Sequence, residues 1–428
     1  MHRAGATVPF GPMRGTVAAL ASARVASLRA VDRSLAVLSL AGFISQVGVA
    51  VMLPLLPLYA RQLGAAPLVL GLLTSGFAVM NTVGQLIVGF LSDRFGARRM
   101  VPTGLGIYAV ANGLIATASS ALPLVAFRSL AGFGGGMNIV AERVYLARVT
   151  PAARMAFTNG VLSAAQSAGT VTGPAIAGLI AAASDLRVPF VLVAVTSVLA
   201  FTGTLFLPRE GPRPGVAPGA TGAAPGAGVA QLEAPSVPLR PLAALLVANL
   251  GLQAGFGGFI TTYSPFTTTR LGWSTAQVGI VFSLFGLGSI VLGPLLGRVA
   301  DRRGRRTVAI LGTLPVIAWA PLLYLGLPDP VIYLGSVLAG AGLAGFGAAW
   351  YALLSEASPA GRQGRYFGFV SAISTLGIIA GALASSLLWE RIDLSIGLLV
   401  PSVAIAIAIP ALLALPRAPS DANKVAAP

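Results

Sequence analysis

The chain has 428 residues, 56% hydrophobic and only 9% charged, which excludes a soluble globular protein, since such domains are about a quarter charged. It has no cysteine and one histidine, His2, so thiolate chemistry, disulfide bonds and histidine-based metal sites are excluded, and we expect no metal and no cofactor. The net charge of +16 does not indicate nucleic-acid binding, because the basic residues recur between apolar runs instead of clustering on one soluble face.

Twelve apolar runs are long enough to cross a membrane as helices, since about 20 apolar residues span ~30 Å of hydrocarbon. In chain order they are Ser34–Tyr59, Leu68–Leu91, Met100–Ser119, Leu122–Leu146, Phe157–Ala183, Val188–Leu207, Leu242–Thr267, Ala276–Leu296, Val308–Leu327, Val331–Leu354, Phe367–Trp389 and Ile396–Leu415. A stretch rich in Pro, Gly and Ala follows the sixth run and predicts a flexible linker. The predicted organisation is an N-terminal tail (1–33), a six-helix bundle (34–207), a cytoplasmic linker (208–241), a second six-helix bundle (242–415) and a C-terminal tail (416–428).

Basic residues orient these helices, because short loops rich in Lys and Arg stay in the cytoplasm. Most of the 28 Lys and Arg residues lie in the two tails and the even-numbered loops. The odd-numbered loops hold only Arg61, Arg187, Arg270 and Arg391. We therefore expect both termini in the cytoplasm. Abundant Ala, Gly and Arg with a single lysine is typical of GC-rich bacterial genes, so we expect a multi-pass protein of a bacterial inner (plasma) membrane.

The two predicted bundles repeat each other at an offset of 208 positions, the separation of Asp93 and Asp301. Glycines, prolines and charges recur at this offset, including Pro57 with Pro265, Gly132 with Gly340, Pro151 with Pro359, Gly169 with Gly377 and Gly173 with Gly381. Each half holds an even number of spans, so the halves are parallel repeats related by an axis along the membrane normal, with the transport path between them.

A charged loop motif stands between the second and third spans and again between the eighth and ninth. The copies, GFLSDRFGARR from Gly89 and GRVADRRGRR from Gly297, closely resemble the G-x-x-x-D-R-x-G-R-R/K signature of the major facilitator superfamily. The resemblance implies a major facilitator fold that works by alternating access. The alternative, simple positive-inside anchors, requires neither the aspartate nor the two glycines. By resemblance, the gating residues are Gly89, Asp93, Arg94, Gly96, Arg98, Gly297, Asp301, Arg302, Gly304 and Arg306.

The fifth span carries regularly spaced small residues. Gly160, Gly169, Gly173, Pro174 and Gly178 resemble the antiporter motif of drug:proton exporters in this superfamily, with Ala177 in place of a glycine. A smooth glycine face beside a proline kink would let a partner helix slide. The alternative is ordinary small-residue packing, which is common in helix bundles.

Two charged residues of the fourth span are our candidates for proton coupling. Arg128 opens a segment similar to an R-x-x-x-G motif of proton-coupled members. An arginine inside a span costs ~2.5 kcal/mol or more unless paired or wetted, although snorkelling to the interface is an alternative. Glu142 is the acid nearest to a cavity position and is expected to face Trp350 across the cavity. An ion pair with the adjacent Arg143 is the alternative.

By the same resemblance, the first, fourth, seventh and tenth spans line the substrate cavity. They offer mostly uncharged and aromatic side chains, with Gln166 of the fifth span as a flank: Gln46, Asn138, Asn249, Gln253, Tyr263, Phe346, Trp350 and Tyr351. Such a surface suits lipophilic compounds better than sugars. We expect a monomer in the lipid bilayer that exports small hydrophobic compounds in exchange for protons. The alternative is an uncoupled or differently coupled transporter of a metabolite or lipid-like molecule. The sequence contains no nucleophile, metal-ligand or paired-acid arrangement of the kind that an enzyme would need.

Overall fold

The computed structural model describes residues 13–151, 154–208, 239–357 and 363–415. Within these ranges it contains helices and no strand, in agreement with the predicted all-α fold. The helices of the first half are α1 (Met13–Gln62), α2 (Pro67–Phe95), α3 (Ala97–Ala116), α4 (Ala121–Val149), α5 (Met155–Ala183) and α6 (Arg187–Leu205). Those of the second half are α7 (Leu239–Arg270), α8 (Thr275–Arg303), α9 (Arg305–Tyr324), α10 (Asp329–Ala357), α11 (Gln363–Arg391), α12 (Leu394–Ala406) and α13 (Ala408–Leu413).

Every predicted span overlaps a helix, and the last one overlaps two. The last span is interrupted at Ile407, three residues before Pro410, which has no N–H to donate to the carbonyl of Ala406. Helix α1 begins at Met13, inside the predicted N-terminal tail, because residues 13–33 are rich in Ala, Leu and Arg, which favour helix. The predicted linker beyond Pro208 and up to residue 238, and the C-terminal tail from 416, lie outside the described residues.

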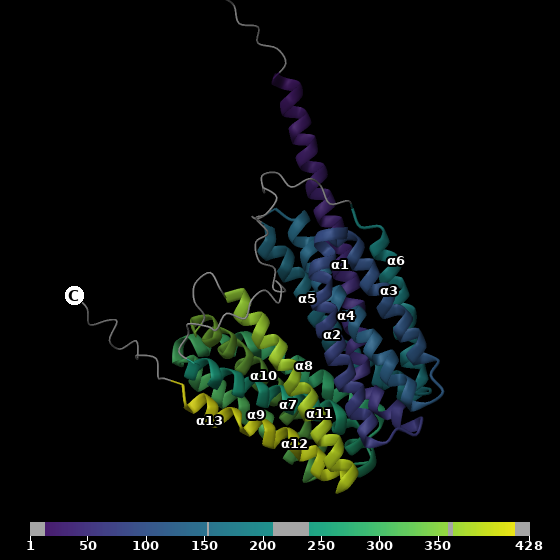
Figure 1. Cartoon of the computed structure of the whole chain (residues 1–428), viewed down its shortest axis with the longest axis vertical. Coiled ribbons are helices and arrows are strands. Elements are labelled where there is room, and N and C mark those ends of the chain that lie inside the picture. Colours follow the sequence, from purple (N-terminus) through teal and green to yellow (C-terminus); the bar gives the residue numbers. More distant parts are fainter. Residues whose placement is uncertain (1–12, 152–153, 209–238, 358–362, 416–428) are drawn as a thin grey trace, which may run out of the picture.

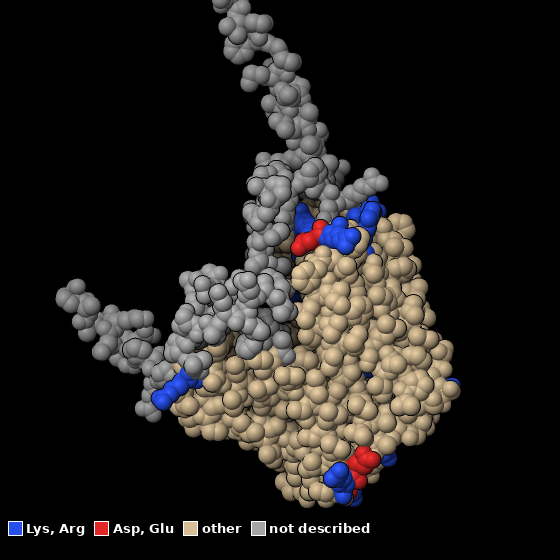
Figure 2. Space-filling view, viewed as in Figure 1, with Lys and Arg blue, Asp and Glu red and all other residues tan. Residues whose placement is uncertain are grey.

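Ten helical segments of the described chain, with α12 and α13 counted together as one, are long and apolar enough to cross a membrane by length and composition. The two further long helices, α3 and α5, pack within the same bundle, α3 against α4 and α6 and α5 against α1. The visible face in Figure 2 shows a broad belt without charge, and the Arg, Lys, Asp and Glu side chains gather near its ends. This distribution is that of a multi-pass membrane protein.

The two halves form separate bundles that converge toward the bottom of Figure 1, away from the N-terminal end of α1. Following the predicted topology, we call the end with Asp185 and Asp393 the outer end and the end with Asp93 and Asp301 the inner end. The halves meet mainly through two helix pairs, α5 with α8 and α2 with α11. These pairs are themselves related by the internal repeat, since α2 corresponds to α8 and α5 to α11.

The 208-residue offset also relates the packing inside each half. In the first half α3 and α4 touch at Gly104 and Gly134, where an added Cβ on Gly104 would lie 3.0 Å from the Gly134 carbonyl oxygen. In the second half α9 and α10 touch at Gly312 and Gly342, where the corresponding distance is 2.6 Å. Only a residue without a side chain permits such close backbone contact.

Candidate functional site

A cavity of about 270 Å³ lies between the two halves. Helices α1 and α2 of the first half and α7 and α11 of the second form its walls, and one side chain of α4 reaches it. The lining residues are Val49, Met52, Leu53, Leu56, Pro57, Leu70, Leu73, Thr74, Phe77, Ala78, Asn81, Thr82, Gln85, Arg128, Phe256, Ile260, Thr375 and Ile378. The wall is mostly apolar, and it contains no carboxylate.

Arg128 is the one charged residue of this wall. Its side chain is buried, 4% exposed, and its guanidinium carbon lies 4.0 Å from the centre of the Phe77 ring. This cation–π contact replaces part of the lost hydration. The Nη1 atom has no hydrogen-bond partner in the described chain. The sequence left snorkelling open for this arginine; the structure instead buries it, at the cavity wall.

The other polar groups of the cavity wall bond to one another or to the backbone. Gln85 donates to Asn81 Oδ1 at 2.7 Å, and Asn81 donates to the Gly132 carbonyl at 3.2 Å. The hydroxyls of Thr82 and Thr375 are 2.9 Å apart and join α2 to α11. These side chains are held in place across the interface between the halves.

Glu142 lies deeper toward the inner end of α4 and is fully buried. Asn138 donates to its Oε1 at 2.9 Å, and Gln166 of α5 donates to its Oε2 at 3.1 Å. No arginine forms an ion pair with it among the described residues, Arg143 included. Three residues singled out by the sequence, on two helices, therefore form one polar cluster. At 1.5 Å per residue it is roughly 21 Å along α4 from Arg128.

None of the nine residues predicted to bind substrate lines the cavity. Besides Asn138 and Gln166, which hold Glu142, Gln46 donates to Thr170 of α5 and Asn249 donates to Ser374 of α11. Trp350 donates to the Leu245 carbonyl and stacks edge-on against exposed Tyr351. The remaining three also lie elsewhere: Gln253 beside Gly377, Tyr263 against Trp319 and Phe282, and Phe346 in the core of the second half.

Sequence reasoning missed the contribution of α2 and α11 to the cavity. A signal was present in the second span, where Asn81, Thr82 and Gln85 interrupt an apolar run. Residues 81 and 85 are four apart and so share one helix face. Polar residues that share a face in an otherwise apolar span point toward a polar partner or a cavity rather than toward lipid.

The first charged loop joins α2 to α3. Gly96 has φ 85°, a left-handed conformation that glycine adopts without strain, which explains the fixed glycine of the motif. Asp93 forms an ion pair with Arg148 of α4 at 3.0 Å. Arg98 donates to the carbonyl of Leu207 beyond the end of α6 at 2.7 Å.

The second charged loop repeats this geometry. Gly304 has φ 99°, and Arg306 donates to the carbonyl of Leu415 at 2.7 Å, exactly 208 positions after Leu207. Asp301 lies 3.5 Å from Arg305, which also pairs with Glu356 of α10. Of the other predicted gating residues, Arg94 lies over the Phe95 ring, Arg302 is exposed, and Gly89 and Gly297 are half-buried.

The glycines of α5 serve two interfaces. Gly169 and Gly173 pack against α1, where an added Cβ on Gly173 would lie 3.0 Å from the Val47 carbonyl oxygen. Gly178 packs against Thr275 and Gly279 of α8, across the boundary between the halves. Gly160, near the inner end, has open space around it, and an added Cβ would meet no atom within 4 Å.

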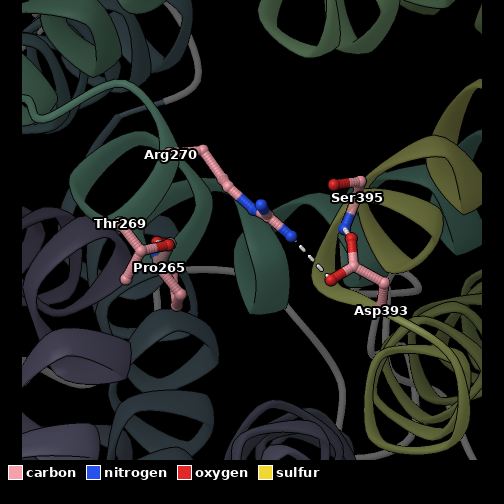
Figure 3. A network of polar contacts seen from close by, with 5 residues as sticks. All are labelled: Pro265, Thr269, Arg270, Asp393 and Ser395. Atoms are coloured by element: carbon pink, nitrogen blue, oxygen red, sulfur yellow. Dashed lines mark hydrogen bonds and ion pairs between the residues drawn. The ribbon is translucent and has the colours of Figure 1, made fainter.

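Ion pairs and hydrogen bonds connect the outer ends of the helices. Arg270, at the end of α7, contacts Asp393 at 2.7 Å, and Asp393 caps α12 by accepting from the Ser395 N–H at 2.8 Å (Figure 3). Between the halves, the Arg61 guanidinium lies 5.2 Å from the centre of the Trp389 ring. Hydrogen bonds from Ser395, together with the Arg270 charge, lower the pKa of Asp393 to about 2.

Sequence comparisons identify relatives of the chain. The profile described as "Major Facilitator Superfamily" matches residues 38–266 and 245–428. The chain is 27% identical to Quinolone resistance protein NorA of Staphylococcus aureus over 248 residues, 57% of this chain and 61% of that protein. It is 28% identical to an uncharacterized MFS-type transporter of Methanocaldococcus jannaschii over 169 residues, 40% of this chain and 44% of that one. The chain thus matches less than two thirds of the length of these relatives.

Solved structures share the fold over nearly the whole chain. A bacterial homolog of the human lysosomal transporter Spinster, inward-facing and unoccupied, aligns with a TM-score of 0.72 and 14% identity over 90% of this chain and 97% of that one. The nucleoside transporter NupG aligns with a TM-score of 0.73 and 13% identity over 90% and 100%. The human organic anion transporter MFSD10 aligns with a TM-score of 0.62 and 20% identity over 89% and 99%.

Proposed function

Because the chain belongs to the Major Facilitator Superfamily, a family of membrane transporters, we propose that it exports small lipophilic compounds in exchange for protons by alternating access. It is a transporter and not an enzyme. The cavity between its halves supports a single chain as the transporting unit, because both walls come from one chain. The similarity to a quinolone resistance protein supports the export of drug-like molecules.

The observation that carries the proposal is the environment of Glu142. A buried carboxylate without a cation bears a desolvation cost that protonation removes. Here two amides satisfy the oxygens of the ionised form, while no arginine of the described chain forms an ion pair with it. Both protonation states are therefore accessible to this group, as a proton carrier requires.

The position of the cluster supports coupling between the proton and the conformation. Gln166, which holds Glu142, belongs to α5, the helix whose Gly173 packs on α1 and whose Gly178 packs on α8 of the other half. A change in the hydrogen bonds of Glu142 acts directly on α5. Any rocking of α5 must alter the contact between the halves, because α5 and α8 form one of the two main contacts there.

The contacts between the halves support an inward-facing state. Contacts across the boundary between described residues involve the outer and central parts of the helices, such as Thr275 with the Gly178 carbonyl at 3.1 Å, Arg61 with Trp389, and Thr82 with Thr375. In alternating access the halves pivot about a central site. A substrate bound in the apolar cavity would be released to the outside after the outer contacts between the halves break and contacts between the inner helix ends form.

The test is transport into everted membrane vesicles with an imposed pH gradient. We expect uphill accumulation of a lipophilic dye that a protonophore abolishes. The Glu142→Gln variant should lose gradient-driven accumulation but keep dye binding and counterflow. Asp185→Asn, which removes an exposed outer carboxylate, is the matched control and should behave as wild type. Full pH-driven accumulation by Glu142→Gln would contradict the proposal and favour the uncoupled alternative.

A further inference from the structure

We propose that the cavity at Arg128 is a binding site for organic monoanions, with the Arg128 guanidinium receiving the carboxylate and the apolar wall receiving the hydrocarbon body. The inference rests on the proposed function, because it names the substrate class of the same transport path. It adds a substrate-binding role to the proton-coupling role that the sequence predicts for Arg128.

The first step is the uncompensated charge. Arg128 is buried at 4% exposure, and no acid of the described chain forms an ion pair with it. None of the cavity-lining residues is acidic, and Glu142, the other charge buried in α4, is too far along the helix to neutralise it. The Phe77 ring supplies a cation–π contact, which is weaker than a charge-assisted pair with a carboxylate.

The second step is that the Arg128 side chain has a hydrogen-bond donor without a partner. Asn81, Thr82, Gln85 and Thr375 are already bonded to one another or to the backbone. Among the lining residues, Arg128 Nη1 is the buried side-chain atom without a hydrogen-bond partner in the described chain. A buried donor left unpaired is costly, and a guanidinium presents its donors in a fork that matches a carboxylate. The cavity therefore offers its strongest unmet interaction to an anion.

The third step is the rest of the wall. Leu53, Phe77, Phe256, Ile260 and Ile378 surround the cavity with aliphatic and aromatic surface. Its volume of about 270 Å³ falls just below the range of roughly 300–1,000 Å³ for drug-sized ligands. This combination fits a small aryl or alkyl carboxylate. An organic cation would meet the like charge of Arg128, and a neutral isostere would leave the cation unneutralised.

The experiment compares three ligands with the same hydrocarbon body: phenylbutyrate, its neutral amide and the corresponding amine. Each is radiolabelled, and its binding to the full chain in lipid nanodiscs is measured by equilibrium dialysis at neutral pH. We expect the carboxylate to bind about 10- to 100-fold more tightly than the amide, the worth of a charged hydrogen bond, and the amine to bind more weakly than the amide. Equal binding of all three to the wild-type protein would overturn the proposal without any variant.

Variants locate the preference. In Arg128→Gln the carboxylate should bind no better than the amide, whereas Arg128→Lys should keep part of the preference because it keeps the charge. Arg187→Gln removes an exposed arginine at the outer end of α6 and should leave the preference intact. An unchanged preference in folded Arg128→Gln would overturn the assignment. The binding assay uses no pH gradient, so it tests the anion site separately from proton coupling. A preference for the carboxylate without proton-driven export would refute the coupling and support the anion site. Proton-driven export without a preference for the carboxylate would support the coupling and refute the anion site.

Discussion

Arg148 and Glu356 occupy equivalent positions in the two halves, 208 residues apart, and carry opposite charges. In the first half Arg148 pairs with Asp93 at 3.0 Å. In the second half Glu356 pairs with Arg305, which also lies 3.5 Å from Asp301. The second half thus keeps an ion network at its inner helix ends but takes the cation from the start of α9 instead of from α10.

This exchange predicts a compensating pair of substitutions. Arg305→Ala leaves Asp301 and Glu356 without their ion-pair partner and should slow transport a few-fold, with a loss of stability of about 1 kcal/mol or less, since both acids are largely exposed. Adding Glu356→Arg copies the first half by placing a cation opposite Asp301, and should restore the rate. The measurement is initial transport rate with melting temperature alongside.

The matched control for that pair is Arg305→Ala with Glu356→Gln, which removes one acid but supplies no cation. If the transport rate of this control recovers as fully as that of the Glu356→Arg variant, relief of the repulsion between Asp301 and Glu356 explains the rescue. The proposed equivalence of Arg148 and Glu356 is then not needed.

The Asp393 carboxylate predicts a pH range for the outer network. Its pKa is about 2 in the folded chain, below the ~3.9 of an unfolded aspartate. A lowered folded pKa gives stability that is fully present above the unfolded value and lost as pH falls toward the folded one. The melting-temperature difference between wild type and Asp393→Asn should therefore stay constant from pH 8 to pH 5 and narrow only below about pH 4. A decrease in this melting-temperature difference between pH 7 and pH 5 would contradict the lowered pKa of Asp393.

The predicted orientation is testable by cysteine labelling, because the natural chain has no cysteine. Ser119→Cys, exposed in the outer connection between α3 and α4, should react with a membrane-impermeant maleimide in intact cells. Phe95→Cys, exposed at the inner end of α2, is the matched control and should react only in everted vesicles. The reverse pattern would place both termini outside.

The helices were predictable because their signals are local. Runs of apolar residues fix where the spans lie, and the repeat at 208 residues anticipates the equivalent packing of Gly104 with Gly134 and of Gly312 with Gly342. The motif glycine Gly96 was predictable for the same reason, since a left-handed turn leaves few residue choices.

The cavity was not predictable from one sequence, because its lining depends on which helix faces the other half. Thr82 belongs to a polar segment of its span, but only the packing of α2 on α11 brings its hydroxyl within 2.9 Å of the Thr375 hydroxyl. Trp350 was expected to face Glu142, yet its indole bonds to the Leu245 carbonyl within the second half. Side-chain direction between bundles carries no periodic signal in the chain, so the roles assigned to these residues stay predictions.

The glycines of α5 predict opposite shifts in conformation from two substitutions in one motif. An added methyl group at Gly178 would press on the backbone of α8 at the outer contact, so Gly178→Ala should open the outer side. Gly160 has open space around it in this structure. If the inner ends close against each other in the other state, Gly160→Leu should obstruct that closure and hold the outer side shut. Distances between spin labels at Ser119 and Ile392, both exposed at the outer end, should lengthen in the first variant and not in the second. Identical distance distributions in both variants would mean that α5 is a static packing helix, and the antiporter-like motif would then have no mechanical role.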